Sequence, residues 1–178
     1  MFPRFPLFID LNTQPCLVVG GGAVGTRRVE TLRRCGAKVR VVSQAFSEAL
    51  VAWAAAEGEE GRGLELVERP FRDRDVEGMR LVVSATDSRE VNAQVARASK
   101  LAKIPVNVCD DPEASNFHFP GLVTRGQLAV GINTNGASPT VSKQVREIIE
   151  MVLPDDFGNR ISRFGRKDPL APQEGDPE

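Results

Sequence analysis

The chain of 178 residues has one histidine, three cysteines and no long hydrophobic run. Its histidine, His118, has no second histidine and no cysteine at a metal-ligand spacing, so no metal site is expected. The cysteines are odd in number and form no Cys-x-x-Cys pair, which argues against both a disulfide framework and a zinc site. We therefore expect buried thiols in a reducing compartment, and hence a cytoplasmic protein.

The chain also lacks an excess of charge of either sign. Its 23 basic and 24 acidic residues leave a formal net charge of -1, which argues against a general binder of nucleic acid or membrane surfaces. No apolar stretch approaches the roughly 18 residues that a membrane span requires, and no signal-peptide pattern opens the sequence. With 41% hydrophobic residues, the composition is that of a globular protein with a substantial core.

The most informative segment is a short apolar run, residues 16–20, that ends in Gly20-x-Gly22-x-x-Gly25 directly before a helical pattern. Gly20 permits a tight strand-to-helix turn, Gly22 lets the backbone approach a pyrophosphate, and Gly25 lets the helix pack close to the sheet. The free N–H groups at the start of that helix then face the phosphates. The pattern predicts a dinucleotide site, although a plain tight turn can also be rich in glycine.

Strand-like and helix-like segments alternate over the first two thirds of the chain. The expected strands cover residues 16–20, 38–42, 64–67, 81–84 and 104–108, and the expected helices cover residues 24–35, 46–56 and 91–101. This alternation predicts an α/β fold with a Rossmann-like, doubly wound parallel sheet. Ligands of such sheets lie beyond the carboxyl ends of the strands, so we expect residues 20–25, 42–44, 85–87 and 108–111 to border one cleft.

The end of the second expected strand lacks the acidic residue that commonly binds the adenosine ribose in this fold. Ser43 and Gln44 stand there instead, and we expect them to act as neutral ribose partners. No arginine follows at once, so NAD is favoured over NADP. Asp87 is placed to cap the next helix and to border the cofactor. The cofactor-binding residues predicted in this way are Gly20, Gly22, Ala23, Val24, Gly25, Ser43, Gln44, Thr86 and Asp87.

The pattern changes after residue 113. Two extended runs, residues 117–124 and 127–133, predict a hairpin, and Ser138-Pro139 predicts the start of a helix that runs to about residue 153. We expect an NAD-binding domain over residues 1–113 and a small α+β region for dimerisation and substrate over residues 114–153. Residues 154–178 should form a short C-terminal segment, with at most one helix near residues 156–164 and a disordered tail.

Several motifs then resemble those of one known family in their order along the chain. They are Phe5–Leu11, Val18–Gly22, Ser84–Asp87, Val91-Asn92, Asn107-Val108-Cys109-Asp110, Ser115–Pro120 and Asn135–Pro139. Together they resemble the precorrin-2 dehydrogenase (sirohydrochlorin synthase) module of siroheme biosynthesis, which occurs alone or as the N-terminal part of siroheme synthases. The resemblance implies a homodimer that oxidises precorrin-2 to sirohydrochlorin, with hydride passing to NAD and protons leaving the macrocycle. Some members also insert ferrous iron.

The resemblance places the catalytic aspartate of the family's Asn-Val-x-Asp segment at Asp110. Because this aromatising oxidation needs a base, a carboxylate that follows the fifth strand suits the task. The alternative is that Asp110 or Asp111 only caps a turn before Pro112.

Other residues are candidates for binding the tetrapyrrole, which carries eight carboxylates. Ser115, Asn116, Thr134 and Asn135 are candidates for polar lining. The basic candidates are Arg27, Arg28, Arg125 and the cluster over residues 160–167, and the alternative for each of them is a solvated surface charge. Family members cover the substrate with a C-terminal helical segment, and here that segment is short.

Two other interpretations remain open. An NAD-binding regulatory or sensor module also begins with Gly-x-Gly-x-x-Gly, but it typically carries the ribose-binding acid that this chain lacks. The chain can also be one part of a larger siroheme synthase whose other part methylates uroporphyrinogen.

Overall fold

The computed structural model describes residues 4–57, 63–126 and 128–157. Its contacts divide the chain into two compact units, one formed by Leu7–Phe119 and the other by the chain from Pro120 onward together with residues 4–6. The boundary expected near residue 113 thus falls inside the first unit. Within the described part of the chain, no helix is long and apolar enough to cross a membrane.

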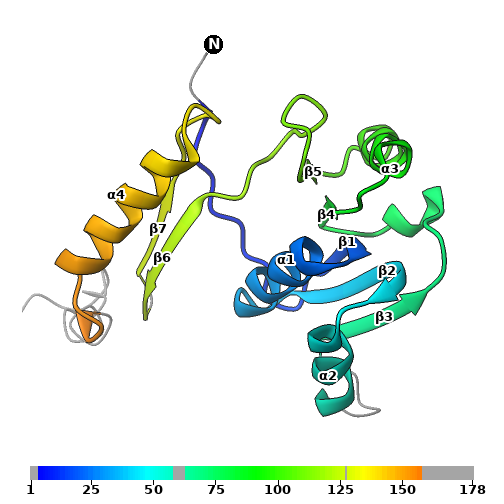
Figure 1. The fold of residues 1–178 in the computed structure, drawn as a ribbon, viewed down its shortest axis with the longest axis horizontal. Coiled ribbons are helices and arrows are strands. Elements are labelled where there is room, and N and C mark those ends of the chain that lie inside the picture. The colour runs from blue at the N-terminus through cyan, green and yellow to red at the C-terminus, as the bar shows by residue number, and fades with distance from the viewer. Residues whose placement is uncertain (1–3, 58–62, 127, 158–178) are drawn as a thin grey trace, which may run out of the picture. The chain divides into compact units, whose positions relative to one another are not determined.

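The first unit is built on a five-stranded parallel sheet with the strand order β3-β2-β1-β4-β5 (Figure 1). The strands are β1 (Pro15–Gly21), β2 (Lys38–Phe46), β3 (Leu64–Glu68), β4 (Leu81–Ser84) and β5 (Val106–Val108). They are connected through α1 (Ala23–Arg34), α2 (Glu48–Glu57), the 3₁₀ helix η1 (Asp73–Val76) and α3 (Arg89–Leu101). The order reverses direction between β1 and β4, so the predicted Rossmann-like, doubly wound sheet is confirmed.

Several predicted element bounds differ from the structure, and three of them have a local reason. The second strand runs on to Phe46, because Gly21 pairs with Phe46 after a register shift in β1. A Cβ on Gly21 would overlap the Ala45 carbonyl oxygen, so only glycine permits this pairing, and α2 starts at Glu48. The fifth strand starts at Val106 because Pro105 has no N–H to donate to a strand ladder.

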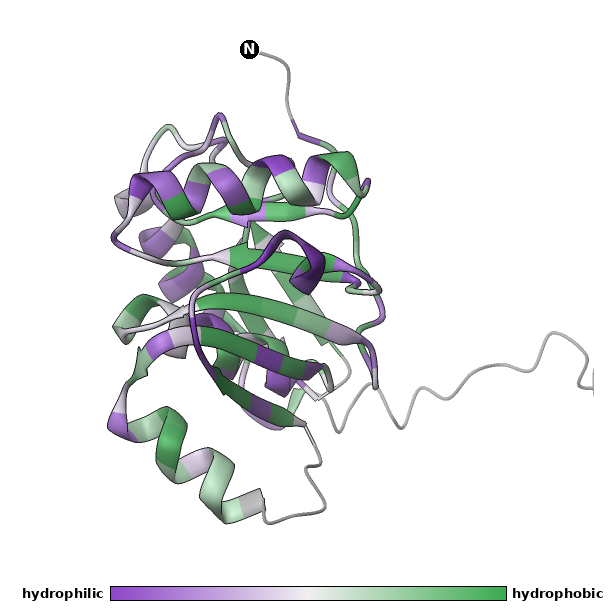
Figure 2. Cartoon of the chain, turned by 90° about the vertical axis from the view of Figure 1, so that its right-hand side faces the viewer, coloured by the Kyte–Doolittle hydropathy of each residue, from purple (hydrophilic) through white to green (hydrophobic). Residues whose placement is uncertain are grey.

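Side chains of the sheet alternate between two hydrophobic layers, and the strands of the sheet are largely hydrophobic along their length (Figure 2). Cys16 and Val18 of β1 belong to the layer that contains α1 and the Leu50 side chain of α2. Leu17 and Val19 belong to the opposite layer, which contains α3 and η1. Strands buried on both faces are expected to read as continuous apolar runs, which explains the sequence of β1 and β4.

The cysteines do not follow the expectation of three buried thiols. Cys16 is fully buried in β1, whereas Cys35 is exposed and Cys109 is partly exposed, and all three are free. Burial raises the pKa of the Cys16 thiol to about 11. Cys35 differs because it follows α1 as its C-cap residue, where the chain has left the buried face.

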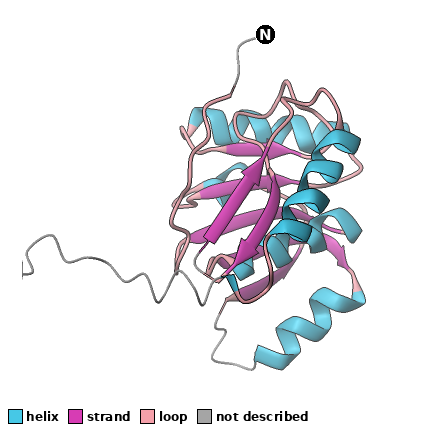
Figure 3. Ribbon diagram, turned by 90° about the vertical axis from the view of Figure 1, so that its left-hand side faces the viewer, coloured by secondary structure: helices cyan, strands magenta, loops and turns pink. Residues whose placement is uncertain are grey.

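The second unit consists of an antiparallel hairpin and a helix (Figure 3). The hairpin pairs β6 (Gly121–Arg125) with β7 (Leu128–Ile132), and α4 (Pro139–Val152) contacts both strands. The Ser138 hydroxyl accepts the Val141 N–H at 3.2 Å, so the predicted N-cap with proline in the first turn is confirmed. The helix expected near residues 156–164 and the disordered tail lie outside the described residues, except for residues 156 and 157.

Candidate functional site

A cleft of about 860 Å³ lies at the carboxyl ends of β1, β2 and β4. All the predicted cofactor residues except Gly25 line it, and residues directly after β3 and from α3 join them. A second cavity, of about 230 Å³, lies at the amino ends of the strands and contains none of the predicted residues. The topology of the parallel sheet therefore brings the predicted cofactor segments together, as expected for this fold.

The glycines of the turn have different structural roles. A Cβ on Gly20 would overlap the Ala85 carbonyl oxygen, and a Cβ on Gly25 would overlap the carbonyl oxygen of Gly20. These two residues let β1, β4 and α1 approach one another closely. A Cβ on Gly22 would meet nothing within 4 Å, although Gly22 lines the cleft. Gly22 thus leaves space that a bound group can enter.

The start of α1 has the properties of an anion site. Gly22 is its N-cap and supplies no side-chain cap, so the first N–H groups of the helix have no side-chain acceptor there. Gly22, Ala23 and Val24 are exposed and line the cleft. A pyrophosphate fits this arrangement, because the helix dipole and the N–H groups both favour a negative charge at that end.

At the edge of β2, Ser43 and Gln44 line the cleft as expected. The Ser43 hydroxyl accepts the Gly21 N–H at 3.0 Å, so this residue also holds the glycine turn. Its assignment as a ribose partner stays a prediction.

At the end of β4, the expected cap of α3 is wrong by one residue. Ser88 is the N-cap, and its hydroxyl accepts the Val91 N–H at 3.3 Å. Asp87 remains exposed on the cleft. The N-cap is the residue directly before the first helical residue, and because α3 begins at Arg89 that residue is Ser88 and not Asp87.

A buried amide connects the cleft to the predicted catalytic residue. The Asn92 side chain on α3 is 4% exposed and donates to the Thr86 carbonyl and to Oδ1 of Asp110, each at 3.0 Å. Its oxygen accepts the hydroxyls of Ser84 at 2.7 Å and Thr86 at 2.8 Å. Asp110 does not itself line the cleft; it is exposed in the turn after β5. The Asn92 side chain therefore links the Asp110 carboxylate to Thr86, which lines the cleft.

The neighbouring carboxylate has a different role. Oδ1 of Asp111 accepts the backbone N–H groups of Glu113 and Ala114, each at 3.0 Å. These bonds cap the turn, which is the alternative that the sequence left open for either aspartate. In the structure this bonding falls to Asp111, whereas the Asp110 carboxylate bonds to Asn92.

The four predicted substrate residues bind backbone groups in the structure. Ser115 and Asn116 accept the N–H groups of Val108 and Val106, at 2.9 and 2.7 Å, along the edge of β5. In the second unit, the Thr134 hydroxyl donates to the Ser138 carbonyl at 3.2 Å. Asn135, at φ 54°, accepts the Arg4 N–H at 3.3 Å. Their assignment to substrate stays a prediction, and the basic cluster of residues 160–167 lies outside the described residues.

Sequence reasoning missed Arg69, which lines the cleft directly after β3. Its guanidinium binds both carboxylate oxygens of Asp75, each at 2.7 Å. Burial alone would raise the pKa of Asp75, but the hydrogen bonds from Arg69 and Arg72 and the charges of Arg69 and Arg74 outweigh it and lower that pKa. The available signal was an arginine next to the third strand end, where ligands of this fold gather.

Together, the sheet order, the glycine turn and the open end of α1 define a Rossmann-type dinucleotide-binding protein. Among the described residues, no cluster of three or more histidine, cysteine or acidic side chains could hold a metal ion.

Comparison with known proteins agrees with this class. The family model described as "Putative NAD(P)-binding" matches residues 7–121, and the chain belongs to this NAD(P)-binding family. It is 42% identical over 154 residues to a siroheme synthase of Methylococcus capsulatus, covering 86% of this chain and 31% of that protein. It is 39% identical over 160 residues to siroheme synthase 1 of Pectobacterium atrosepticum, covering 90% of this chain and 32% of that protein. The chain thus spans about a third of the length of these curated relatives.

A solved structure matches this chain over a larger share of its own length. The precorrin-2 dehydrogenase SirC has a TM-score of 0.70 and 27% identity, over 89% of this chain and 76% of that one. The similarity therefore extends through both units of the chain and not only through the dinucleotide-binding unit.

Proposed function

We propose that this chain is an NAD-dependent dehydrogenase that oxidises precorrin-2 to sirohydrochlorin. The observation that carries the proposal is the placement of Asp110, which a buried asparagine holds next to the wall of a dinucleotide cleft. The similarity to SirC and to siroheme synthases supports the choice of substrate. The cysteine content supports a cytoplasmic location.

The oxidation removes one hydride and one proton from the macrocycle, and bound NAD supplies the hydride acceptor. Asp110 is the general base that takes the proton. Its carboxylate suits this role because Asn92 donates to Oδ1 and so fixes its orientation at the end of β5, while its exposure leaves the second oxygen open to a substrate. The start of α1 would hold the pyrophosphate, and the ends of β2 and β4 would hold the rest of the cofactor.

Anaerobic incubation of the protein with precorrin-2 and NAD tests this proposal. We expect NADH and sirohydrochlorin to form in equal amounts, and absorbance spectroscopy measures both products. A second reaction with ferrous iron tests for siroheme formation, and hence for ferrochelatase activity in the same chain. Binding of NAD without formation of NADH would contradict the dehydrogenase and favour the NAD-binding sensor module.

We further propose that the protein is a homodimer and that α4 contributes to the contact. Exposed apolar side chains follow one face of α4, namely Val141, Val145, Ile148 and Val152, with Met151 beside them. Their spacing of three and four residues places them on one stripe of the helix. An exposed apolar stripe of this kind is typical of an interaction surface.

Replacing Ile148 with aspartate should therefore dissociate the dimer, because it places a charge in the centre of the stripe. Light scattering coupled to gel filtration at micromolar concentration should give twice the 19.4 kDa chain mass for the wild type and the chain mass for Ile148→Asp. Thr140→Asp is the control, since it adds the same charge at an exposed position of α4 outside the stripe. A wild-type monomer, or a dimer that survives Ile148→Asp, would contradict the proposed contact.

A further inference from the structure

Arg69 lies at the edge of the cleft where this fold distinguishes NAD from NADP. The backbone N–H of Arg69 donates to the Ser43 carbonyl at 3.0 Å, so Arg69 lies directly beside the end of β2. In Rossmann folds an acidic residue at the end of β2 binds the ribose 2′-hydroxyl, and an arginine nearby accommodates the 2′-phosphate of NADP. Here β2 contributes the neutral Ser43 and Gln44, and Arg69 is the one basic residue among the described residues that line the cleft.

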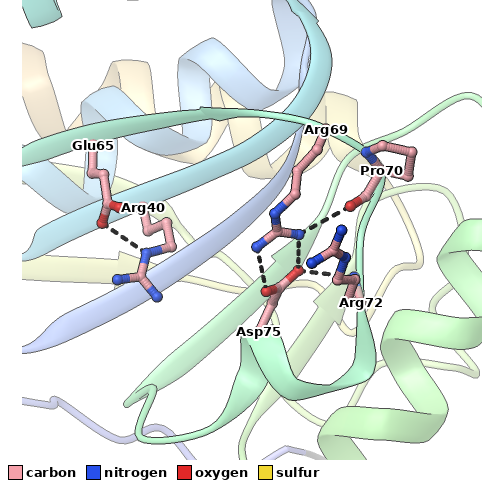
Figure 4. Close-up of polar contacts among 6 residues, drawn as sticks. All are labelled: Arg40, Glu65, Arg69, Pro70, Arg72 and Asp75. Atoms are coloured by element: carbon pink, nitrogen blue, oxygen red, sulfur yellow. Dashed lines mark hydrogen bonds and ion pairs between the residues drawn. The ribbon is translucent and has the colours of Figure 1, made fainter.

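Taken alone, this arrangement would favour a 2′-phosphate, but the guanidinium already has an anionic partner. Nη1 and Nη2 of Arg69 donate to the two carboxylate oxygens of Asp75, each at 2.7 Å, and Nη1 also donates to the Pro70 carbonyl at 3.0 Å (Figure 4). This is the bidentate geometry with which arginine binds a phosphate. The donors that would bind the 2′-phosphate are therefore occupied.

The carboxylate is itself held firmly in place. Asp75 is 5% exposed, and its Oδ2 also accepts the Arg72 N–H at 2.8 Å, at the start of η1. The Asp75 side chain is thus fixed by two bonds from a guanidinium and one from the backbone. A 2′-phosphate would have to compete with a fixed anion for Arg69 and would lie close to its negative charge.

We propose that the Arg69–Asp75 pair determines the cofactor preference of this protein, and that Asp75 excludes NADP by occupying Arg69. This inference rests on the proposed use of NAD at the cleft, but it does not depend on the identity of the substrate. It also explains how a cleft without an acidic residue at the end of β2 selects the cofactor without a 2′-phosphate.

The test compares NAD and NADP binding by calorimetry with the full chain. In the wild type, NADP should bind at least about tenfold more weakly than NAD. In Asp75→Asn the ratio of the two Kd values should shift toward NADP by about tenfold or more, because asparagine keeps the shape and an acceptor oxygen but removes the charge. In Arg69→Gln/Asp75→Asn the gain in NADP binding should disappear, since the Arg69 guanidinium that would bind the 2′-phosphate is then absent.

Glu65→Gln is the matched control. Glu65 on β3 accepts a hydrogen bond from Nε of Arg40 on β2 at 2.7 Å, but this pair is more exposed than Arg69–Asp75 and lines the cavity at the amino ends of the strands (Figure 4). The substitution removes the same unit of charge, and the ratio of Kd values should not change. A purely structural role of Asp75 would lower the melting temperature of Asp75→Asn without changing that ratio.

Several outcomes would overturn the inference. NADP binding as tight as NAD binding in the wild type would do so even if Asp75→Asn failed to fold. A folded Asp75→Asn with an unchanged ratio, or a double variant that keeps the gain, would also do so. Failure of both cofactors to bind would contradict the dinucleotide site itself, whereas normal binding without precorrin-2 oxidation would contradict only the proposed function.

Discussion

Replacing Asp110 with asparagine is expected to lower kcat for precorrin-2 oxidation by about 10²- to 10⁴-fold, the usual range for loss of a general base. Asparagine has the same shape, and its oxygen can still accept the hydrogen bond that Asn92 donates at 3.0 Å. The turn after β5 should therefore remain intact, while the group that accepts the proton is lost. Stopped-flow measurement of NADH formation at saturating substrate gives the rate, and calorimetry should show unchanged NAD binding.

Asp111→Asn provides a control at the next position in the chain. Its Oδ1 accepts two backbone N–H bonds, which an asparagine oxygen can also accept, so we expect kcat close to that of the wild type. Normal turnover by Asp110→Asn, or an equal loss in both variants, would contradict the assignment of the base to Asp110.

Replacing Gly25 with alanine is expected to destabilise the fold strongly, whereas Gly22→Ala should impair only cofactor binding. The new Cβ at position 25 would overlap the Gly20 carbonyl oxygen, and overpacking against backbone costs about 3 kcal/mol. For a chain of this length that corresponds to a melting temperature lower by roughly 6 to 12 °C. At position 22 the Cβ enters open space in the cleft, so we expect an unchanged melting temperature and a Kd for NAD raised about tenfold, equivalent to about 1.4 kcal/mol.

Gly131→Ala is the control for this pair. A Cβ at this position would make only ordinary contacts, at 3.5 Å from Pro120, in the unit that does not contain the cleft. Neither the melting temperature nor NAD binding should change. A stable Gly25→Ala protein, or a Gly22→Ala protein that binds NAD normally, would show that the glycines do not divide their roles in this way.

The adjacent aspartates show which features of the site the sequence could predict and which it could not. Both Asp110 and Asp111 follow a strand that could be recognised from its apolar residues, so the sequence located the candidate base to within one position. Which carboxylate caps the turn depends on the conformation after β5, where Asp111 is placed over the N–H groups of Glu113 and Ala114. Sequence reasoning also named Asn92 as part of a motif, but its hydrogen bond to Asp110 spans 18 positions of the chain.

The sequence by itself determined the class of fold, the glycine turn and three of the strand ends that border the cleft, those of β1, β2 and β4, whereas it wrongly included the end of β5 and missed the segment after β3. These features depend on local signals, namely the apolar period of each segment and the need for glycine where a Cβ would overlap the backbone. Only the tertiary structure decided which polar groups are paired: Arg69 with Asp75, Asn92 with Asp110, and Ser115 and Asn116 with β5. The physical reason is that a hydrogen bond requires two atoms within about 3 Å in the right orientation. That placement is set by strand order, register and the exact start of each helix, which no local pattern specifies.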